Sequence, residues 1–268
     1  MIHGTDTLAF TASALSFFFR NLNKPIILTG SNIPLANAIN DAARNLTVAI
    51  LYAASLDVPE VCVFFNNMLL RGNRTTKTDV NGLNAFESPN YPPLATLKVH
   101  TELHSTNVAR YPRGKLSVRT SMDSNILVVK LVPGFSDRAL ASIVRDGSLR
   151  GLVLEFYGSG TGLSGKPTLL EAVTEATDNG VVVVAATQCL KGTVDLGAYE
   201  VGVDALSTGI VSSGDMTTEA AVTKLGYLLG TGAPAERVRA LMRVPFCGEL
   251  TPLEEYKRVS LTPRQDFY

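Results

Sequence analysis

Short apolar runs alternate along the chain with stretches of helical periodicity, which is the pattern of an α/β protein. In the first half this predicts strands over 24–31 and 58–67, and helices over 11–22 and 37–56. Both strands are apolar on either side, so we expect a parallel sheet that is covered by helices on both faces.

The second half alternates in the same way, although no segment of its sequence repeats the first half. The pattern predicts strands over 124–135, 149–160 and 181–189, and helices over 136–147, 168–180, 213–230 and 234–243. The helix at 136 has Ser136 or Asp137 as a candidate N-cap, and the helix after 213 has Asp215 or Thr217.

Polar stretches without periodicity separate these elements. We expect 69–82 to form a hairpin or loop at a sheet edge, 87–99 to be a proline-rich connector, and 100–123 to be irregular. The predicted fold is therefore two α/β domains. Their predicted bounds are 1–110, a linker at 111–123, a second domain with a parallel sheet at 124–254, and a tail at 255–268.

The charge balance excludes several classes of partner. Lys plus Arg and Asp plus Glu both number 24, so the chain has no overall attraction for nucleic acid or for an anionic membrane. The uninterrupted apolar segments are too short to cross a bilayer, and the first residues lack the basic and apolar regions of a secretory signal. We therefore expect a cytoplasmic protein that binds neither nucleic acid nor membrane.

The cysteines and histidines do not suggest a metal site. The three cysteines have no metal-ligand spacing, and the three histidines are scattered. Because Cys62 and Cys189 follow apolar, strand-like residues, we expect both to be buried thiols in a reducing compartment.

Thr5, Asp6 and Lys77 form a chemically sensible trio. A hydroxyl becomes a nucleophile when a base removes its proton, and a lysine that is oriented by a carboxylate can be that base. The residues alone leave a structural interpretation open, because Thr5 and Asp6 precede a helical run and could cap it, and Lys77 lies in a polar turn.

Two other loops are candidate ligand sites. The stretch TGSNIP (29–34) follows a strand, so its backbone N–H groups could hold an anion or could simply turn into the next helix. The stretch YGSGTGLSG (157–165) lacks the glycine spacing of a dinucleotide loop and has no P-loop lysine, so we expect a flexible connection or a loop beside the substrate.

A family resemblance is carried by several of these motifs in order along nearly the whole chain. The motifs that carry the resemblance are HGTDT (3–7), AFTASALSFFFRNLNKPIILTGSNIP (9–34), the stretch from 59 to 94 that contains TTKTD, LVPGFS (131–136), ATQCLKGTVDLGAYEVG (186–202), GDMTTEAAVTKLGYLL (214–229) and CGELTP (247–252). The sequence closely resembles the type I (cytoplasmic) L-asparaginases.

The resemblance implies hydrolysis of the side-chain amide of L-asparagine to aspartate and ammonia, with no metal and no cofactor. It implies two α/β domains and assembly as a homodimer or homotetramer. Thr5 and Asp6 match the family's second catalytic threonine and its aspartate, and Lys77 matches the triad lysine. Gly4 matches a backbone position that lines the substrate. By this carry-over Lys77 activates Thr5 or an adjacent water, and Asp6 holds the substrate's α-amino group.

The sequence also departs from the family's pattern. The family has a segment before HGTDT that carries a first threonine on a mobile loop, a tyrosine that helps to activate it, and an Asp-Ser pair for the substrate's α-carboxylate. We expect the N-terminal domain of this sequence to be truncated, and the 268-residue chain alone to have no useful asparaginase activity.

Further departures concern regulation. Asn32 replaces a glutamine, Glu155 stands where type I relatives often have arginine, and Thr161 stands where they often have asparagine. The positions that match an allosteric asparagine site in some bacterial members are Thr76, Cys189 and Lys224. Because Glu155 would repel an effector carboxylate, we expect that site to be vestigial and unregulated.

Two other functions remain open from the sequence. One is an amidohydrolase of the glutaminase or amidotransferase type. The other is a non-catalytic protein that binds an amino acid or a full-length partner.

Overall fold

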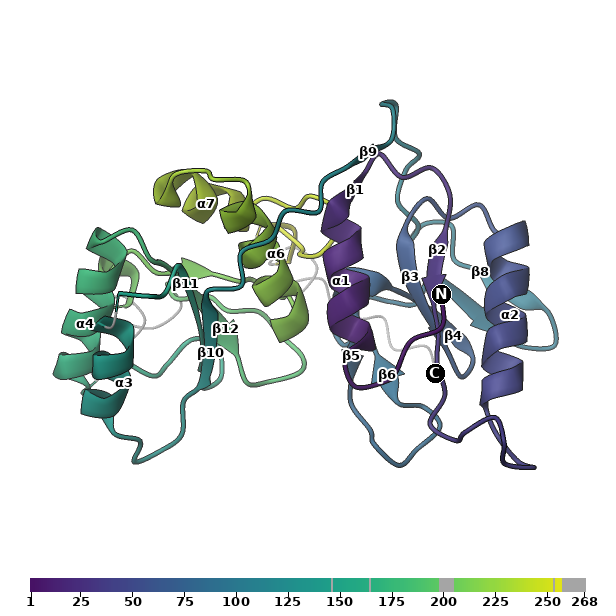
Figure 1. The fold of residues 1–268 in the computed structure, drawn as a ribbon, viewed down its shortest axis with the longest axis horizontal. Coiled ribbons are helices and arrows are strands. Elements are labelled where there is room, and N and C mark those ends of the chain that lie inside the picture. Colours follow the sequence, from purple (N-terminus) through teal and green to yellow (C-terminus); the bar gives the residue numbers. More distant parts are fainter. Residues whose placement is uncertain (146, 164, 198–204, 253, 257–268) are drawn as a thin grey trace, which may run out of the picture.

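The computed structural model describes residues 1–145, 147–163, 165–197, 205–252 and 254–256. The described residues form two lobes that lie side by side (Figure 1), each with its own sheet and helices. Helix α1 (Leu8–Phe18) of the first lobe and helix α6 (Thr218–Gly230) of the second face each other between the sheets. The predicted class, two α/β domains, is confirmed. The predicted tail lies almost wholly outside the described residues.

The sheet of the first lobe has five strands in the order β2-β3-β4-β7-β8. The strands are β2 (Ile26–Leu28), β3 (Val61–Phe65), β4 (Met68–Arg71), β7 (Ala95–Leu97) and β8 (Thr101–Leu103). Only β2 and β3 are parallel, whereas the other three pairs are antiparallel. The prediction of a parallel sheet is therefore wrong for most of this lobe. Only Asn66 and Asn67 separate β3 from β4, and so short a turn permits only an antiparallel hairpin.

The prediction of a hairpin or loop at a sheet edge over 69–82 is wrong for its first residues and correct for its last ones. Its first residues form β4 inside the sheet, followed by a 3₁₀ turn η1 (Gly72–Arg74), and both are almost entirely buried. The chain then enters a separate hairpin in which β5 (Thr76–Lys77) pairs with β6 (Phe86–Glu87). The polar residues of β4 and η1 concealed their burial, because their partners lie far away in the sequence.

Each face of this sheet is covered by one helix. On one face of the sheet, Leu8 and Ala12 of α1 pack in the same core as Val63 of β3. On the opposite face, Ala49 and Tyr52 of α2 (Ala42–Ser55) pack in a second core. The alternation of inward residues along β3 supplies both cores, as expected for a strand buried on two faces. Both helices exist as predicted, but α1 begins earlier and α2 begins later than the periodicity indicated.

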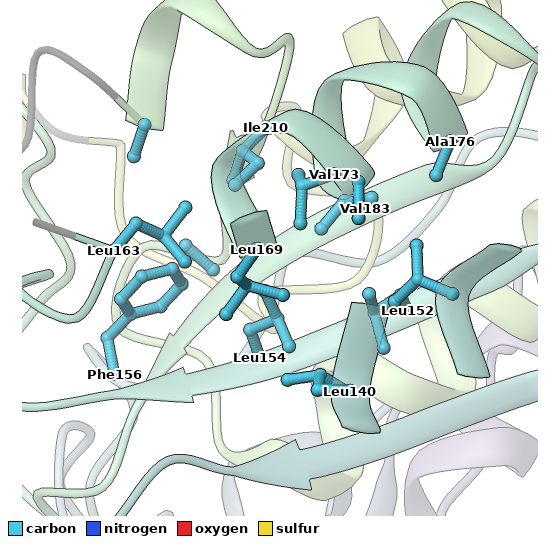
Figure 2. Packing of buried hydrophobic residues seen from close by; sticks show 14 of the residues in the cluster. Leu140, Leu152, Leu154, Phe156, Leu163, Leu169, Val173, Ala176, Val183 and Ile210 are labelled. Carbon is cyan, nitrogen blue, oxygen red and sulfur yellow. The ribbon is translucent and has the colours of Figure 1, made fainter. Parts of the chain in front are cut away.

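The second lobe has a four-stranded sheet that is parallel throughout, as predicted. Its strands are β10 (Ile126–Lys130), β11 (Gly151–Phe156), β12 (Val182–Thr187) and β13 (Val211–Ser212). Helices α3 (Asp137–Arg145) and α4 (Pro167–Asp178) cover one face, and α6 and α7 (Ala235–Met242) cover the other. Figure 2 shows the first of these cores, where Leu152 and Leu154 of β11 face Leu140 and Leu169 from the two helices.

Local capping determines where two of these helices begin. The hydroxyl of Ser136 accepts the backbone N–H of Ala139 at 3.2 Å, and that of Thr217 accepts the N–H of Ala220 at 3.1 Å. Of the two N-cap candidates predicted for each helix, Ser136 caps α3 and Thr217 caps α6.

The segment between the lobes is mostly exposed. It includes a short ladder in which β1 (Phe19–Arg20) pairs with β9 (Ser117–Val118). Towards its end it packs on α6, where the N–H of Asp123 donates to the carbonyl of Gly226. No helix in the described part of the chain is long and apolar enough to cross a membrane.

The two cysteines that were predicted to be buried differ. Cys62 is buried in β3, but Cys189 is exposed. Strand β12 ends at Thr187, and the N–H of Cys189 bonds the hydroxyl of Thr187 in the turn that follows. The apolar run that precedes Cys189 therefore ends before it, and the prediction for this thiol is wrong.

Candidate active site

The first three residues extend the sheet of the first lobe beside β2. Ile2 forms a parallel bridge with Thr29. The N–H of Thr29 donates to the carbonyl of Met1 at 3.0 Å, and the N–H of His3 donates to the carbonyl of Thr29 at 2.9 Å. A Cβ on Gly30 would lie 2.4 Å from the carbonyl oxygen of His3, so this close approach requires glycine. Gly4, Thr5 and Asp6 consequently emerge at the carboxyl end of a strand, where α/β folds place their ligands.

Lys77 reaches this rim from β5, 71 residues away from Asp6 in the sequence. Its Nζ lies 2.9 Å from Oγ1 of Thr5 and 2.8 Å from Oδ1 of Asp6. The structure thus brings together all three side chains that the sequence singled out. The Lys77 side chain is 19% exposed, whereas that of Asp6 is 94% exposed, so the amine is sheltered and the carboxylate faces solvent.

The contact with Lys77 changes the pKa of the Asp6 carboxyl. The hydrogen bond from Lys77, followed by its positive charge, lowers the pKa of Asp6 below its ordinary value. Asp6 is therefore ionised throughout the neutral range and can hold a cation.

His3 supports this rim, a role that was not predicted from the scattered positions of the histidines. Its Nδ1 lies 2.8 Å from the carbonyl of Gly4, and its Nε2 lies 2.9 Å from the hydroxyl of Thr11 on α1. Since a carbonyl only accepts, we assign a proton to Nδ1, whose N–H donates to the carbonyl of Gly4. The position of His3 directly before Gly4 and Thr5 was the available signal.

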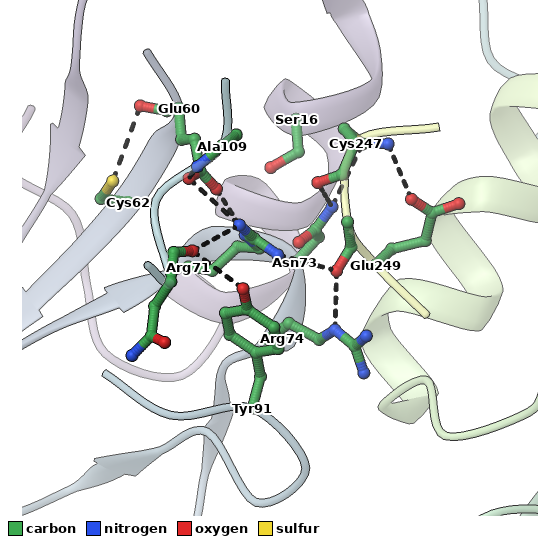
Figure 3. A network of polar contacts seen from close by, with 12 residues as sticks. Ser16, Glu60, Cys62, Arg71, Asn73, Arg74, Tyr91, Ala109, Cys247 and Glu249 are labelled. Carbon is green, nitrogen blue, oxygen red and sulfur yellow. Dashed lines mark hydrogen bonds and ion pairs between the residues drawn. The ribbon is translucent and has the colours of Figure 1, made fainter. Parts of the chain in front are cut away.

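The segment that leads to Lys77 is held by both lobes (Figure 3). Arg71 pairs with Glu60 inside the first lobe and lies 4.2 Å above the ring of Tyr91. Arg74 pairs with Asp215 of the second lobe at 2.8 Å and donates to the carbonyl of Gly248 at 2.7 Å. Both arginines are almost fully buried, so their charge-assisted bonds fix the path of the chain into β5.

The three predicted allosteric positions take part in separate contacts. Thr76 donates to Glu219 at 2.7 Å, and Cys189 is exposed. Lys224 is fully buried and bonds Glu249 and the carbonyls of Met242 and Val244, which uses all three of its N–H donors. No hydrogen bond or ion pair joins any two of these three side chains in the described structure. Their assignment to a vestigial effector site stays a prediction.

The positions that depart from the family's pattern also have partners. The amide of Asn32 donates to the carbonyl of Gly82 at 2.7 Å, which ties the loop after β2 to the loop after Lys77. The carboxylate of Glu155 accepts from Thr218 at 2.6 Å, and Thr161 forms a bridge with Tyr157.

No metal cluster is found at this site among the described residues, where no three His, Cys, Asp or Glu side chains gather in a way that could hold a metal ion. A cavity of about 210 Å³ lies between the lobes at the other end of α1, where Phe17, Arg20 and Phe246 contribute to its wall. The rim around Lys77 is instead an open, polar surface.

Comparison with known proteins matches both lobes. A family model described as "Asparaginase, N-terminal" covers residues 1–109, and one described as "Glutaminase/Asparaginase C-terminal domain" covers residues 125–242. L-asparaginase 1 of Escherichia coli is 43% identical over 94% of this chain and 74% of that protein. The 60 kDa lysophospholipase of Mus musculus is 42% identical over 94% of this chain and 44% of that protein.

Solved structures agree with the sequence comparison. The crystal structure of L-asparaginase I from Vibrio cholerae superimposes with a TM-score of 0.88 at 41% identity, over 93% of this chain and 75% of that one. Both lobes, their order and the sequence identity therefore show that this chain belongs to the asparaginase family.

Proposed function

We propose that this protein hydrolyses the side-chain amide of L-asparagine to L-aspartate and ammonia, with Thr5, Asp6 and Lys77 as its catalytic residues. The observation that carries the proposal is the contact of one sheltered amine, Lys77, with both a hydroxyl and a carboxylate. Relatives named L-asparaginase at 41–43% identity supply the reaction.

The nucleophilic step uses Thr5 and Lys77. In the structure Nζ of Lys77 donates to Oγ1 of Thr5 at 2.9 Å. For the nucleophilic step the amine first gives up a proton, and Nζ then accepts the proton of Oγ1 as this oxygen attacks the amide carbon. The tetrahedral adduct expels ammonia, which takes the proton back from Lys77. Water then cleaves the ester on Thr5, so asparagine and water are the only reactants consumed.

Asp6 provides charge for binding. Its Oδ1 accepts from Lys77, and its side chain is otherwise open to solvent. The second oxygen is therefore available to the α-ammonium group of asparagine, and the lowered pKa keeps the carboxylate ionised. Gly4 supplies a backbone edge beside the bound amino acid, and no side chain there narrows the approach.

The decisive experiment measures ammonia release from L-asparagine by the wild-type chain and by Thr5→Val and Lys77→Met. Its wild-type arm also tests the prediction that the 268-residue chain alone has no useful activity, and release at an enzyme-like rate would refute that prediction. We expect each substitution to reduce kcat by on the order of 1,000-fold, because a nucleophile or its base is lost. Lys98→Met is the matched control. Lys98 lies away from this rim, and its Nζ forms an exposed ion pair with Glu102 at a distance of 2.7 Å. Equal activity of Lys77→Met and Lys98→Met would contradict the assignment.

A non-catalytic role in binding an amino acid is the second candidate. It is favoured by the near-complete exposure of Asp6, because an amide-cleaving site gains from excluding water. Calorimetry with L-aspartate separates the two: binding to the wild-type chain without any ammonia release would support this role and contradict the hydrolase.

Several finer properties stay predictions of the resemblance. They are the preference for asparagine over glutamine, assembly as a homodimer or homotetramer, a cytoplasmic location and the absence of a cofactor. The ammonia assay with L-glutamine in place of L-asparagine tests the first, and sedimentation tests the second.

A further inference from the structure

Helix α6 of the second lobe contacts both pieces of the chain that build the site. Its first turn carries Glu219, whose carboxylate accepts the hydroxyl proton of Thr76 at 2.7 Å. One turn later, Thr223 meets Ser13 of α1 at 2.7 Å between the hydroxyl oxygens. Thr76 directly precedes Lys77, and α1 begins two residues after Asp6.

The contact between Glu219 and Thr76 determines where Lys77 points. Successive side chains of a strand lie on opposite faces, so the Thr76 side chain turns towards α6 while that of Lys77 turns towards Thr5. Thr76 and Glu219 are each only 9% exposed, which keeps water from competing for their bond. Holding Thr76 therefore fixes the rotation of the strand and the direction of Lys77.

Strand β5 is too short to fix this rotation by its own pairing, although Arg71 and Arg74 fix the path of the chain that leads into it. It contains two residues, and its pairing with β6 has only two registered positions. A two-residue ladder does not hold its own orientation in water, so contacts from outside the hairpin decide it.

The second contact closes a ring of bonded elements. The hydroxyl of Thr223 donates to the carbonyl of Glu219 at 2.7 Å, and with its proton used it accepts from Ser13. The ring runs from Glu219 through Thr76 and Lys77 to Thr5, along α1 to Ser13, and back through Thr223. Every contact in it lies between 2.7 and 2.9 Å.

We propose that Glu219 is a positioning residue, which holds Lys77 against Thr5 and Asp6 through the hydroxyl of Thr76. The site in the first lobe consequently depends on the second lobe of the same chain. This inference rests on the proposed function only in naming Lys77 the catalytic base, and its geometric content can be tested without turnover.

The test uses Asp6 as a reporter, because Lys77 is what lowers the pKa of this carboxyl. The full chain is labelled with [¹³C]carboxyl-aspartate, Asp6 is assigned from its loss in Asp6→Asn, and its pKa is measured by NMR titration. Thr76→Val keeps the side-chain shape and removes the hydroxyl. Glu219→Ala removes the acceptor instead and serves if Thr76→Val does not fold.

We expect the pKa of Asp6 to rise towards its ordinary value in Thr76→Val and Glu219→Ala. It should stay lowered in Thr76→Ser and Glu219→Gln, which retain the hydroxyl and an acceptor oxygen. Asp79 is the internal control, because the backbone N–H groups of Gly82 and Asn81 lower its pKa and Lys77 does not contribute. A folded Thr76→Val with an unchanged Asp6 would overturn the proposal, and so would a shift of Asp6 and Asp79 together, which indicates general loosening.

Kinetics gives a second readout if the wild-type chain releases ammonia. A displaced base lowers kcat, by about tenfold or more in Thr76→Val, while KM changes little because Asp6 still meets the substrate's ammonium. Recovery of kcat in Thr76→Ser would support positioning, whereas an equal loss in both variants would contradict it. A chain without ammonia release contradicts only the proposed function, and the titration of Asp6 still decides this inference.

Discussion

Two lysine–carboxylate pairs of nearly equal length lie in opposite environments. Lys77 and Asp6 are 2.8 Å apart at the rim of the first lobe, with side chains 19% and 94% exposed. Lys224 and Glu249 are 2.6 Å apart between α6 and the segment that follows α7, and both are fully buried. The same pair of charged groups therefore lies at the proposed substrate site in one place and inside a dry contact between packed elements in the other.

The surroundings of each pair differ accordingly. Lys224 also donates to two carbonyls, and Glu249 accepts the N–H groups of Phe246 and Cys247, so both charges are satisfied. Burial lowers the pKa of Lys224, and the charge of Glu249 opposes this shift. Asp6 has Lys77 as its only charged partner in the described residues, which leaves it free to exchange that contact for a ligand.

The largest expected difference between the pairs is in stability. Lys224→Met leaves the charge of Glu249 buried and unpaired, and we expect a loss of about 3–5 kcal/mol in the free energy of unfolding. Lys77→Met is the same substitution in an exposed pair, where little change is expected because water replaces the partner. Urea unfolding of both variants measures the contrast, and similar losses would show that burial does not distinguish them.

A double variant separates charge from packing at the buried pair. In Lys224→Met with Glu249→Gln the buried charge is gone, and the glutamine oxygen still accepts from Phe246 and Cys247. We expect it to recover at least about 1 kcal/mol of the loss. A double variant as unstable as Lys224→Met would attribute the whole loss to packing.

The contact that links the two regions should have an intermediate effect. Ser13 lies on α1 near the site, and its partner Thr223 directly precedes Lys224. Ser13→Ala removes one buried hydrogen bond, while Thr223 keeps its bond to Glu219, so we expect a loss of about 1 kcal/mol. Ser55→Ala is the control, because Ser55 is exposed and bonds only within its own helix. Equal stability of the two variants would show that the lobes are not coupled there.

The helices and strands of the second lobe could be predicted because the sequence pattern within each segment is enough to identify it. In β11 and β12 the residues are apolar on both faces, and helices with helical spacing separate them, so pattern alone identifies a parallel sheet. The N-caps at Ser136 and Thr217 follow from chemistry within three residues.

The first lobe and the site depended on contacts that no local pattern contains. Arg71 and Arg74 look like residues of a polar loop, yet they are buried by partners more than 100 residues away, such as Asp215 and Gly248. Likewise, the spacing of Thr5 and Lys77 says nothing of their contact, and the family resemblance singled it out. The contact of Glu219 could not be predicted, because an acidic residue in the first turn of a helix is explained equally well by the helix dipole.

The smallest expected effect concerns the pH dependence of the exposed pair, for which Asp6→Asn is the informative variant. The pKa of Asp6 is lowered in the folded protein, so folding favours its ionised form. The stabilisation from the pair is therefore fully present above about pH 4, the ordinary value of an aspartate, and is lost as the pH falls through the lowered pKa. Thermal unfolding of the wild-type chain and Asp6→Asn should differ slightly at pH 6, less at high salt, and not at all once Asp6 is protonated. A difference that persists at the lowest pH would mean that Asp6 contributes through shape rather than charge, and the rim would then resemble the buried pair more closely than its exposure indicates.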